Sequence, residues 1–130
     1  MSIVTIDRLA EILPDKACLI GLDHGTKRIG IAATNSTRSI IFPVETMERR
    51  GLEKDLTHLA GVMAMRRSHF IVLGLPLNMD GTEGPRAQSV RAFADNILEH
   101  RDLYEETPVI IFHDERLSTA AAEDKLIDDL

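Results

Sequence analysis

The chain has 130 residues, of which 44% are hydrophobic and 28% are charged. This length gives room for one domain with a buried core, and not for two. No apolar run is long enough to cross a bilayer and no signal-peptide pattern opens the chain, so we expect a cytoplasmic protein with no membrane partner. Cys18 is the single cysteine, which excludes an internal disulfide and a zinc cluster built on cysteines.

The formal net charge of −6 would by itself disfavour nucleic acid as a partner. However, residues 1–100 carry twelve acidic and twelve basic side chains, whereas residues 101–130 carry nine acidic and three basic ones. The imbalance therefore lies in the last thirty residues, and the body of the chain is neutral. The formal net charge also counts carboxylates that hold a divalent cation as negative charges that repel phosphates, although the bound ion reverses this effect. The net charge excludes neither nucleic acid nor a metal site.

The first predicted elements are a short helix and a group of strands. Apolar residues from Ile6 to Leu13 fall on one helical face, and Pro14 ends this pattern. Three short apolar runs separated by turn-forming residues follow, and they predict an antiparallel meander of strands. These runs are Cys18 to Leu22, Ile29 to Ala33 and Ser39 to Val44.

The rest of the chain alternates between helical and strand patterns. The predicted elements are a helix from Leu52 to about Arg66, a strand from Phe70 to Leu75, a helix from Pro85 to Leu98, a strand from Val109 to Phe112, and a last helix with Ser118 as its N-cap and Glu123 to Leu130 as its body. Such alternation predicts parallel strands joined by right-handed crossovers. The expected fold class is therefore α/β, with a mixed five-stranded sheet and helices on both faces.

Candidate site residues follow three of the predicted strands. Ligands of such sheets bind beyond the carboxyl ends of the parallel strands. Asp23 ends the first strand, the loop “NMDGTEGPR” follows the fourth, and “HDER”, with Asp114 and Glu115, ends the fifth. Two acids on neighbouring strand ends can share Mg²⁺, which prefers carboxylate oxygens and keeps water in its other positions. A metal held there can polarise a phosphodiester and activate a water molecule.

Each of these features also has an ordinary structural explanation. Asp23 precedes a glycine and can be a turn residue. Asp114 and Glu115 precede a predicted helix, whose positive end favours acids. Lys27 and Arg28 can be solvated charges on a hairpin. The loop after the fourth strand can be a set of tight turns, although long loops between a buried strand and a helix often carry function. Spacing alone thus predicts a mixed α/β domain with a phosphate or metal site.

Three motifs together resemble a known family. “GLDHGTKRIGIA”, “LGLPLNMDGTEGPRA” and “DERLSTAAAE” are similar to motifs of the YqgF family, also called RuvX, which is described as Holliday junction resolvases and as nucleases that process pre-16S rRNA. The similarity runs from about Leu19 to the end of the chain. It implies a ribonuclease-H-like fold and hydrolysis of structured nucleic acid, either pre-rRNA or branched DNA, with Mg²⁺ or Mn²⁺ as cofactor.

The resemblance also implies roles for individual residues. Asp23 matches the first-strand acid of the family, and Glu115 or Asp114 matches the acid after the fifth strand. Asp23 and Glu115 would hold the metal, and the loop “NMDGTEGPR” would shape the access of substrate. Family positions suited to holding phosphates are occupied by Lys27, Arg28, Asn78, Arg86 and Arg116.

One departure from the family keeps other hypotheses open. The family continues into a basic segment and a last helix with a further aspartate, whereas this sequence ends at Leu130. We therefore expect one nuclease domain over residues 1–130 without that helix. A protein that binds structured nucleic acid without cutting it is a second hypothesis. A third is a nucleotide-binding fragment, because “GLDHGTKRIG” is also similar to the first phosphate loop of actin-like proteins and sugar kinases. A homodimer would suit a branched substrate and would leave no sure mark in one chain.

Overall fold

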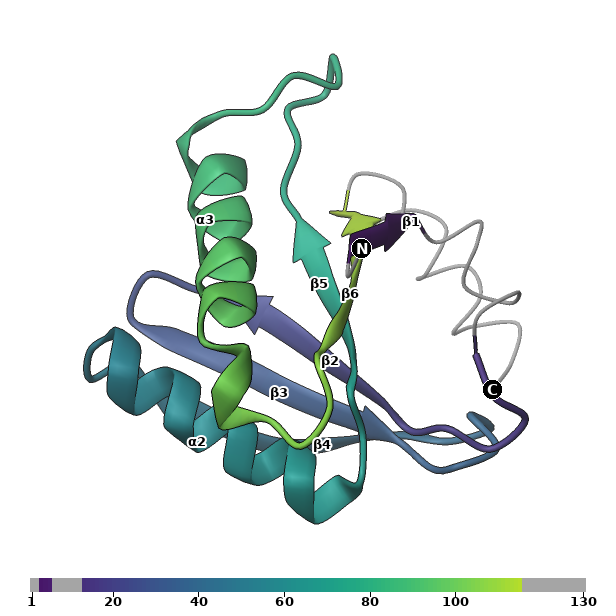
Figure 1. The fold of residues 1–130 in the computed structure, drawn as a ribbon. Coiled ribbons are helices and arrows are strands. Elements are labelled where there is room, and N and C mark those ends of the chain that lie inside the picture. Colours follow the sequence, from purple (N-terminus) through teal and green to yellow (C-terminus); the bar gives the residue numbers. More distant parts are fainter. Residues whose placement is uncertain (1–2, 6–12, 116–130) are drawn as a thin grey trace.

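A computed structural model gives the structure of the chain and describes residues 3–5 and 13–115 (Figure 1). The elements in chain order are β1 (Ile3–Thr5), β2 (Leu19–His24), β3 (Arg28–Thr34), β4 (Ile41–Glu48), α2 (Leu52–Arg66), β5 (Phe70–Leu75), α3 (Pro85–Glu99), the short 3₁₀ helix η2 (Arg101–Leu103) and β6 (Val109–Asp114). The helices expected over residues 6–13 and 118–130 lie outside the described residues, apart from Leu13.

The strands form one mixed sheet of six strands in the order β1-β6-β5-β2-β3-β4. β2, β3 and β4 are an antiparallel meander, and β5 and β6 pair in parallel with β2 and with each other, as the sequence predicted. β1 is a sixth strand that the sequence analysis did not anticipate. It pairs in parallel with the outer edge of β6, with Ile3 opposite Ile110. The strand that precedes Glu115 is therefore paired on both sides.

The predicted position of the third strand of the meander was wrong at both ends. The structure places β4 at Ile41–Glu48, whereas the apolar pattern had suggested Ser39 to Val44. Asn35 explains the late start, because its side-chain oxygen accepts hydrogen bonds from the main-chain nitrogens of Ser39 and Ile40 at 2.9 and 3.0 Å. These bonds hold the chain in a turn before the strand begins. β4 also continues beyond Val44 to Glu48. It is an edge strand of the sheet, and polar residues are tolerated on its solvated side.

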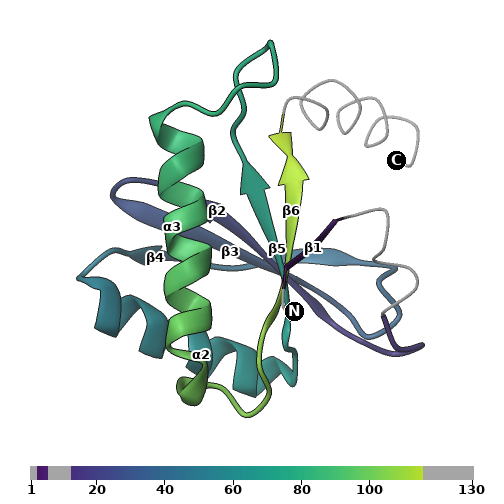
Figure 2. The ribbon, with the colours of Figure 1, turned by 45° about the horizontal axis from the view of Figure 1, so that its top comes forward.

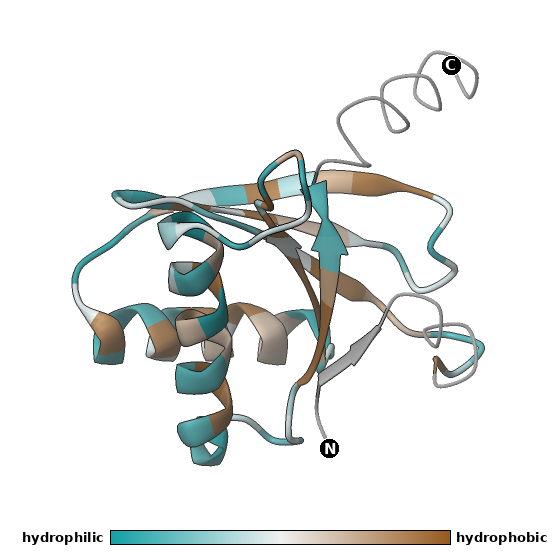
Figure 3. Ribbon diagram, turned by 90° about the horizontal axis from the view of Figure 1, so that it is seen from above, coloured by the Kyte–Doolittle hydropathy of each residue, from teal (hydrophilic) through white to brown (hydrophobic). Residues whose placement is uncertain are grey.

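Both described long helices cover the same face of the sheet (Figures 1 and 3). Their apolar sides bury Leu56, Leu59 and Met63 from α2 and Val90 and Ile97 from α3. Pro85 is at the start of α3, where a first helical turn needs no main-chain donor. Neither of these helices is long and apolar enough to cross a membrane. The sheet face opposite α2 and α3 is the one on which the acidic residues lie.

Candidate active site

Two of the predicted carboxylates meet on the sheet face opposite α2 and α3. Leu22 and His24 in β2 are buried, and Asp23 between them is exposed, because successive side chains of a strand point to opposite faces. Glu115 directly follows β6. Asp23, Glu115 and His113 line a single hollow with a volume of about 580 Å³. The sheet thus brings together residues that are 92 positions apart in the chain.

Two glycines lie next to these carboxylates, and one of them, Gly74, leaves space for its neighbour. Gly30 of β3 is directly opposite Asp23, and a Cβ atom added to Gly30 would lie 3.5 Å from the Cβ of Asp23. Gly74 of β5 is closer to the second acid, because an added Cβ would lie 3.0 Å from Cδ of Glu115 and 3.2 Å from Cγ. Neither glycine was predicted from the sequence to belong to the site. The available signal was an isolated glycine inside a strand pattern, which often marks the close approach of another group.

The hollow changes the acidity of Glu115. Its pKa is raised, first by burial and then by the negative charge of Asp23, while Arg86 and His113 oppose this shift. The raised pKa means that the hollow disfavours a bare carboxylate at Glu115, mainly through burial and secondarily through repulsion by Asp23. A divalent cation would remove this repulsion, and carboxylate oxygens are the donors that Mg²⁺ and Mn²⁺ prefer. The carboxylate donors of the hollow therefore fit a hard divalent cation.

Glu115, and not Asp114, shares the hollow with Asp23. Asp114 is the last residue of β6, opposite Leu75, and it does not line the hollow that His113 and Glu115 line. Asp23 and Asp114 lie within the last two residues of β2 and β6, which extend slightly further than the sequence predicted. Among the residues that the structure describes, no group of three or more His, Cys, Asp or Glu side chains is arranged to hold a metal.

The predicted phosphate-binding residues differ in how close they lie to the hollow. Arg86, in the first turn of α3, donates a hydrogen bond to the main-chain carbonyl of His24, next to Asp23. Arg28 pairs with Glu48 across the β3–β4 hairpin at 3.1 Å, and neither Arg28 nor Lys27 lines the hollow. Asn78 lies in the loop between β5 and α3, where its side chain donates to the Thr82 hydroxyl at 3.0 Å. Arg116 lies outside the described residues.

His24 faces away from the hollow and packs under α3. Its ring lies 4.8 Å from the ring of Phe93, and both of its ring nitrogens are buried without a hydrogen-bond partner. The pKa of His24 is lowered to about 4, mainly by burial and then by the positive charges of Arg49 and Arg86. Arg49 also donates a hydrogen bond to the carbonyl of Gly25 at 3.1 Å. His24 is therefore neutral at physiological pH and belongs to the core.

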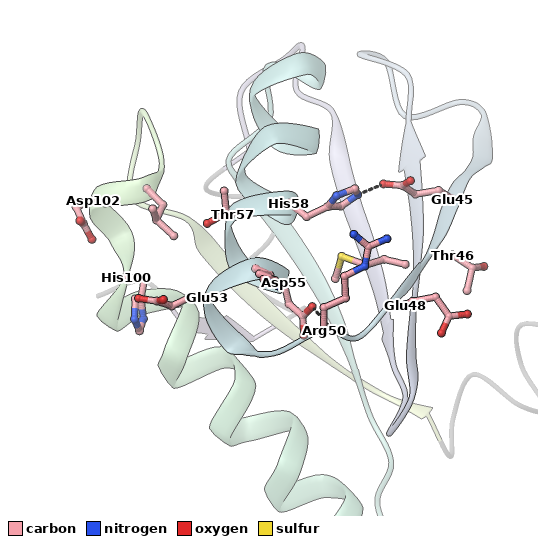
Figure 4. A pocket seen from close by; sticks show the side chains of 13 residues that line it. Glu45, Thr46, Glu48, Arg50, Glu53, Asp55, Thr57, His58, His100 and Asp102 are labelled. Carbon is pink, nitrogen blue, oxygen red and sulfur yellow. Dashed lines mark hydrogen bonds and ion pairs between the residues drawn. The ribbon is translucent and has the colours of Figure 1, made fainter.

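A larger hollow of about 810 Å³ lies elsewhere, between β4, α2 and η2. Figure 4 shows His58 on α2 pointing toward Glu45 on β4, with which it forms a hydrogen bond. Asp55 accepts a hydrogen bond from the main-chain nitrogen of Arg50 at 2.9 Å in the same region. Acidic and basic side chains are mixed in its lining, so it shows no preference for one sign of charge. Because Asp23 and Glu115 both lie in the smaller hollow, we place the candidate site there.

The comparison with protein families agrees with the motifs in the sequence. A family profile described as “RuvX: Holliday junction resolvase” matches residues 17–129, which is most of the chain. The chain belongs to the RuvX family.

Two relatives in the RuvX family illustrate the extent of the similarity. A protein of Bradyrhizobium sp. (strain ORS 278), named “Putative pre-16S rRNA nuclease”, is 48% identical over 114 residues, which are 88% of this chain and 68% of that protein. A protein of the same name from Roseobacter denitrificans is 48% identical over 124 residues, which are 95% of this chain and 74% of that protein.

A solved structure extends the comparison to the fold. T. thermophilus RuvC, in complex with a Holliday junction substrate, aligns with a TM-score of 0.57 at 11% sequence identity, over 84% of this chain and 72% of that chain. At this level of identity the similarity concerns the fold alone. It confirms the ribonuclease-H-like α/β fold that the sequence predicted for this member of the RuvX family.

Proposed function

We propose that the protein is a metal-dependent endonuclease that hydrolyses phosphodiesters in structured nucleic acid. The observation that carries this proposal is the meeting of Asp23 and Glu115 in one hollow, with Gly74 leaving the space that the Glu115 carboxylate fills. The nuclease names of the RuvX relatives support it. The substrates that those names suggest are pre-16S rRNA and branched DNA of the Holliday-junction type.

In this proposal Asp23 and Glu115 hold Mg²⁺ or Mn²⁺. When bound, such an ion supplies Lewis-acid polarisation of a phosphodiester and favours ionisation of water at neutral pH. The raised pKa of Glu115 supports this role, because burial and, after it, the negative charge of Asp23 disfavour a bare carboxylate there, and a bound cation would favour the ionised form. Asp114 has no part in holding the ion.

Positive groups around the hollow would hold the nucleic-acid backbone. α3 begins at Pro85 with no acidic residue in its first turn, so its N-terminus favours an anion. Arg86 lies at this N-terminus and close to Glu115. Arg28 can exchange its exposed partner Glu48 for a phosphate at small cost, because exposed ion pairs contribute little to stability. Lys27, Asn78 and Arg116 complete the proposed set of phosphate contacts.

The test is a cleavage assay on a four-way DNA junction and on precursor 16S rRNA. Each substrate is incubated with the protein in Mg²⁺, in Mn²⁺ or in chelator, beside an Asp23→Asn variant and an Asp114→Asn control. We expect metal-dependent cutting by the wild type and by Asp114→Asn, and none by Asp23→Asn or in chelator. Cutting that survives in Asp23→Asn would contradict the proposal.

The same assay separates cutting from binding alone. A protein that only binds structured nucleic acid would retard both substrates in a gel and cleave neither in any metal. The cleavage rates also show which substrate is preferred. A tenfold higher rate on one substrate corresponds to about 1.4 kcal/mol of additional transition-state stabilisation. Sedimentation of the protein with and without the junction would measure whether a homodimer forms.

A further inference from the structure

The loop between β5 and α3, residues 76–84, carries an apolar side chain that the proposed chemistry does not use. The loop projects beyond the carboxyl end of β5, as two views of the ribbon show (Figures 1 and 2). Met79 lies in this loop and is 88% exposed. At this exposure the side chain of Met79 is largely accessible to a binding partner.

Hydrogen bonds within the loop hold Met79 in a defined turn. The main-chain nitrogen of Gly81 donates to the carbonyl of Asn78 at 2.9 Å, which makes Met79 a central residue of a four-residue turn. Gly81 has φ of 90°, a conformation that favours glycine. The carboxylate of Asp80 accepts hydrogen bonds from the main-chain nitrogen and the hydroxyl of Thr82, at 3.0 and 2.6 Å. Met79 is therefore presented by an ordered turn.

The base of the loop is fixed to the strand that leads to Glu115. Glu83 pairs with Arg91 of α3 at 2.6 Å. The guanidinium of Arg91 lies 4.9 Å above the ring of Phe112, which is three residues before Glu115. This connection limits movement of the loop relative to β6, and the loop leaves the sheet at the same edge as the acid pair.

The chemistry of the loop suggests which kind of partner it meets. Of its two carboxylates, Glu83 is paired with Arg91, which offsets its charge and lessens the repulsion of a nearby phosphate backbone, and Asp80 accepts hydrogen bonds from Thr82. An apolar side chain on a rigid support can pack between base steps and unstack them, and methionine is one of the residues that proteins use for this. Its flexible, polarisable thioether adapts to flat surfaces of different shape.

We propose that Met79 packs against an unstacked base of the nucleic acid beside the acid pair, and that the protein thereby selects substrates with a branch, bulge or loop. The inference rests on the proposed nuclease function for its partner. It assigns recognition of the unpaired base to the loop and leaves the chemistry to Asp23 and Glu115. A base that is already unpaired costs less to unstack, so selectivity for structured substrates follows.

The test uses the full chain with Asp23→Asn in every variant, so that the nucleic acid stays intact. A four-way DNA junction carries 2-aminopurine either at the branch or deep within one arm, since the emission of this base rises when it unstacks. Met79→Ala is compared with Met79→Leu, which keeps the apolar bulk. The control is Met65→Ala, because Met65 on α2 is also 88% exposed and lies outside the loop.

We expect emission at the branch to rise when the Asp23→Asn protein binds, and emission within the arm to stay constant. Met79→Ala should abolish the rise and weaken junction binding about tenfold, without changing affinity for a fully paired duplex. Met79→Leu and Met65→Ala should behave like the parent. Unchanged emission and affinity in Met79→Ala would overturn the inference, favour a protein partner for the loop and leave metal-dependent cleavage standing. Failure of the Asp23→Asn protein to bind any nucleic acid would overturn this inference and the proposed function together.

Discussion

Replacing Gly74 with alanine should inactivate the proposed site while leaving the fold intact. The added Cβ would lie 3.0 Å from Cδ of Glu115, whereas carbon atoms in ordinary contact are about 3.5–4.0 Å apart. The Glu115 carboxylate must therefore move by roughly 1 Å, and a displacement of this size at a catalytic group can cost about 10²-fold in rate. We expect cleavage to fall about 10²-fold.

The free energy of unfolding of Gly74→Ala should be equal to that of the wild type or higher, although its activity falls. The atoms that must move are the end of a flexible side chain at the surface of the hollow, so their displacement costs little. The φ angle of Gly74 is not positive, and replacing a strand glycine by alanine lowers the entropy of the unfolded chain. We expect the free energy of unfolding to stay constant or to rise by up to about 1 kcal/mol.

The assay combines urea unfolding, junction cleavage and titration with Mn²⁺ alone. Gly21→Ala is the matched control, because it adds the same methyl group to a neighbouring strand and meets no atom within 4 Å. Mn²⁺ should stabilise the wild type and Gly21→Ala against unfolding, and should stabilise Gly74→Ala much less. Wild-type cleavage and Mn²⁺ binding by Gly74→Ala would refute the argument that the Glu115 carboxylate needs this space.

Other predictions concern the acids, the buried histidine and the region around α2. Glu115→Gln should lower cleavage at least about 10²-fold, whereas Asp114→Asn should retain most of it, and equal losses in the two variants would contradict the geometry. His24 stays neutral in the folded protein down to a pKa of about 4, while the unfolded chain binds a proton below about 6.5. The stability that it contributes is therefore complete above pH 6.5 and falls by up to about 3 kcal/mol toward pH 4, and urea unfolding should show a smaller loss in His24→Leu over this range. Asp55→Ala removes a buried acceptor from the Arg50 main chain and should lower the free energy of unfolding by about 2–4 kcal/mol; a change below about 0.5 kcal/mol in urea unfolding would show that this contact is dispensable.

The strand and helix pattern of this chain could be predicted because its core elements are locally consistent. The apolar run from Phe70 to Leu75 and the helical spacing from Leu52 to Met63 each leave one interpretation, and the structure agrees with both. The start of β4 could not be predicted, since it depends on the bonds that Asn35 makes in the preceding turn. β1 is only three residues long, and its pairing with β6 is a tertiary contact that leaves no periodic signal.

The candidate site could be predicted only in part. Asp23 and an acid after the fifth strand were predicted from their places at strand ends; the expectation that these strands are neighbours was wrong, because β5 lies between β2 and β6. The choice between Asp114 and Glu115 required the register of β6, because one residue of difference along a strand turns a side chain to the other face. The roles of Gly74 and Arg49 depend on distances between separate elements, and the sequence shows neither. The roles of Asp23 and Glu115 as metal ligands, and of the basic residues as phosphate contacts, remain predictions.

Arg49 and Arg86 each donate a hydrogen bond to a main-chain carbonyl at the end of β2, at Gly25 and at His24. These two guanidinium groups anchor the backbone immediately after Asp23. Substituting Arg49, which also lies over the ring of Phe93 in α3, would thus displace the Asp23 carboxylate without touching nucleic acid. A genetic screen for inactive variants should therefore recover positions on both sides of the sheet, and inactivity at Arg49 would not identify it as a substrate contact.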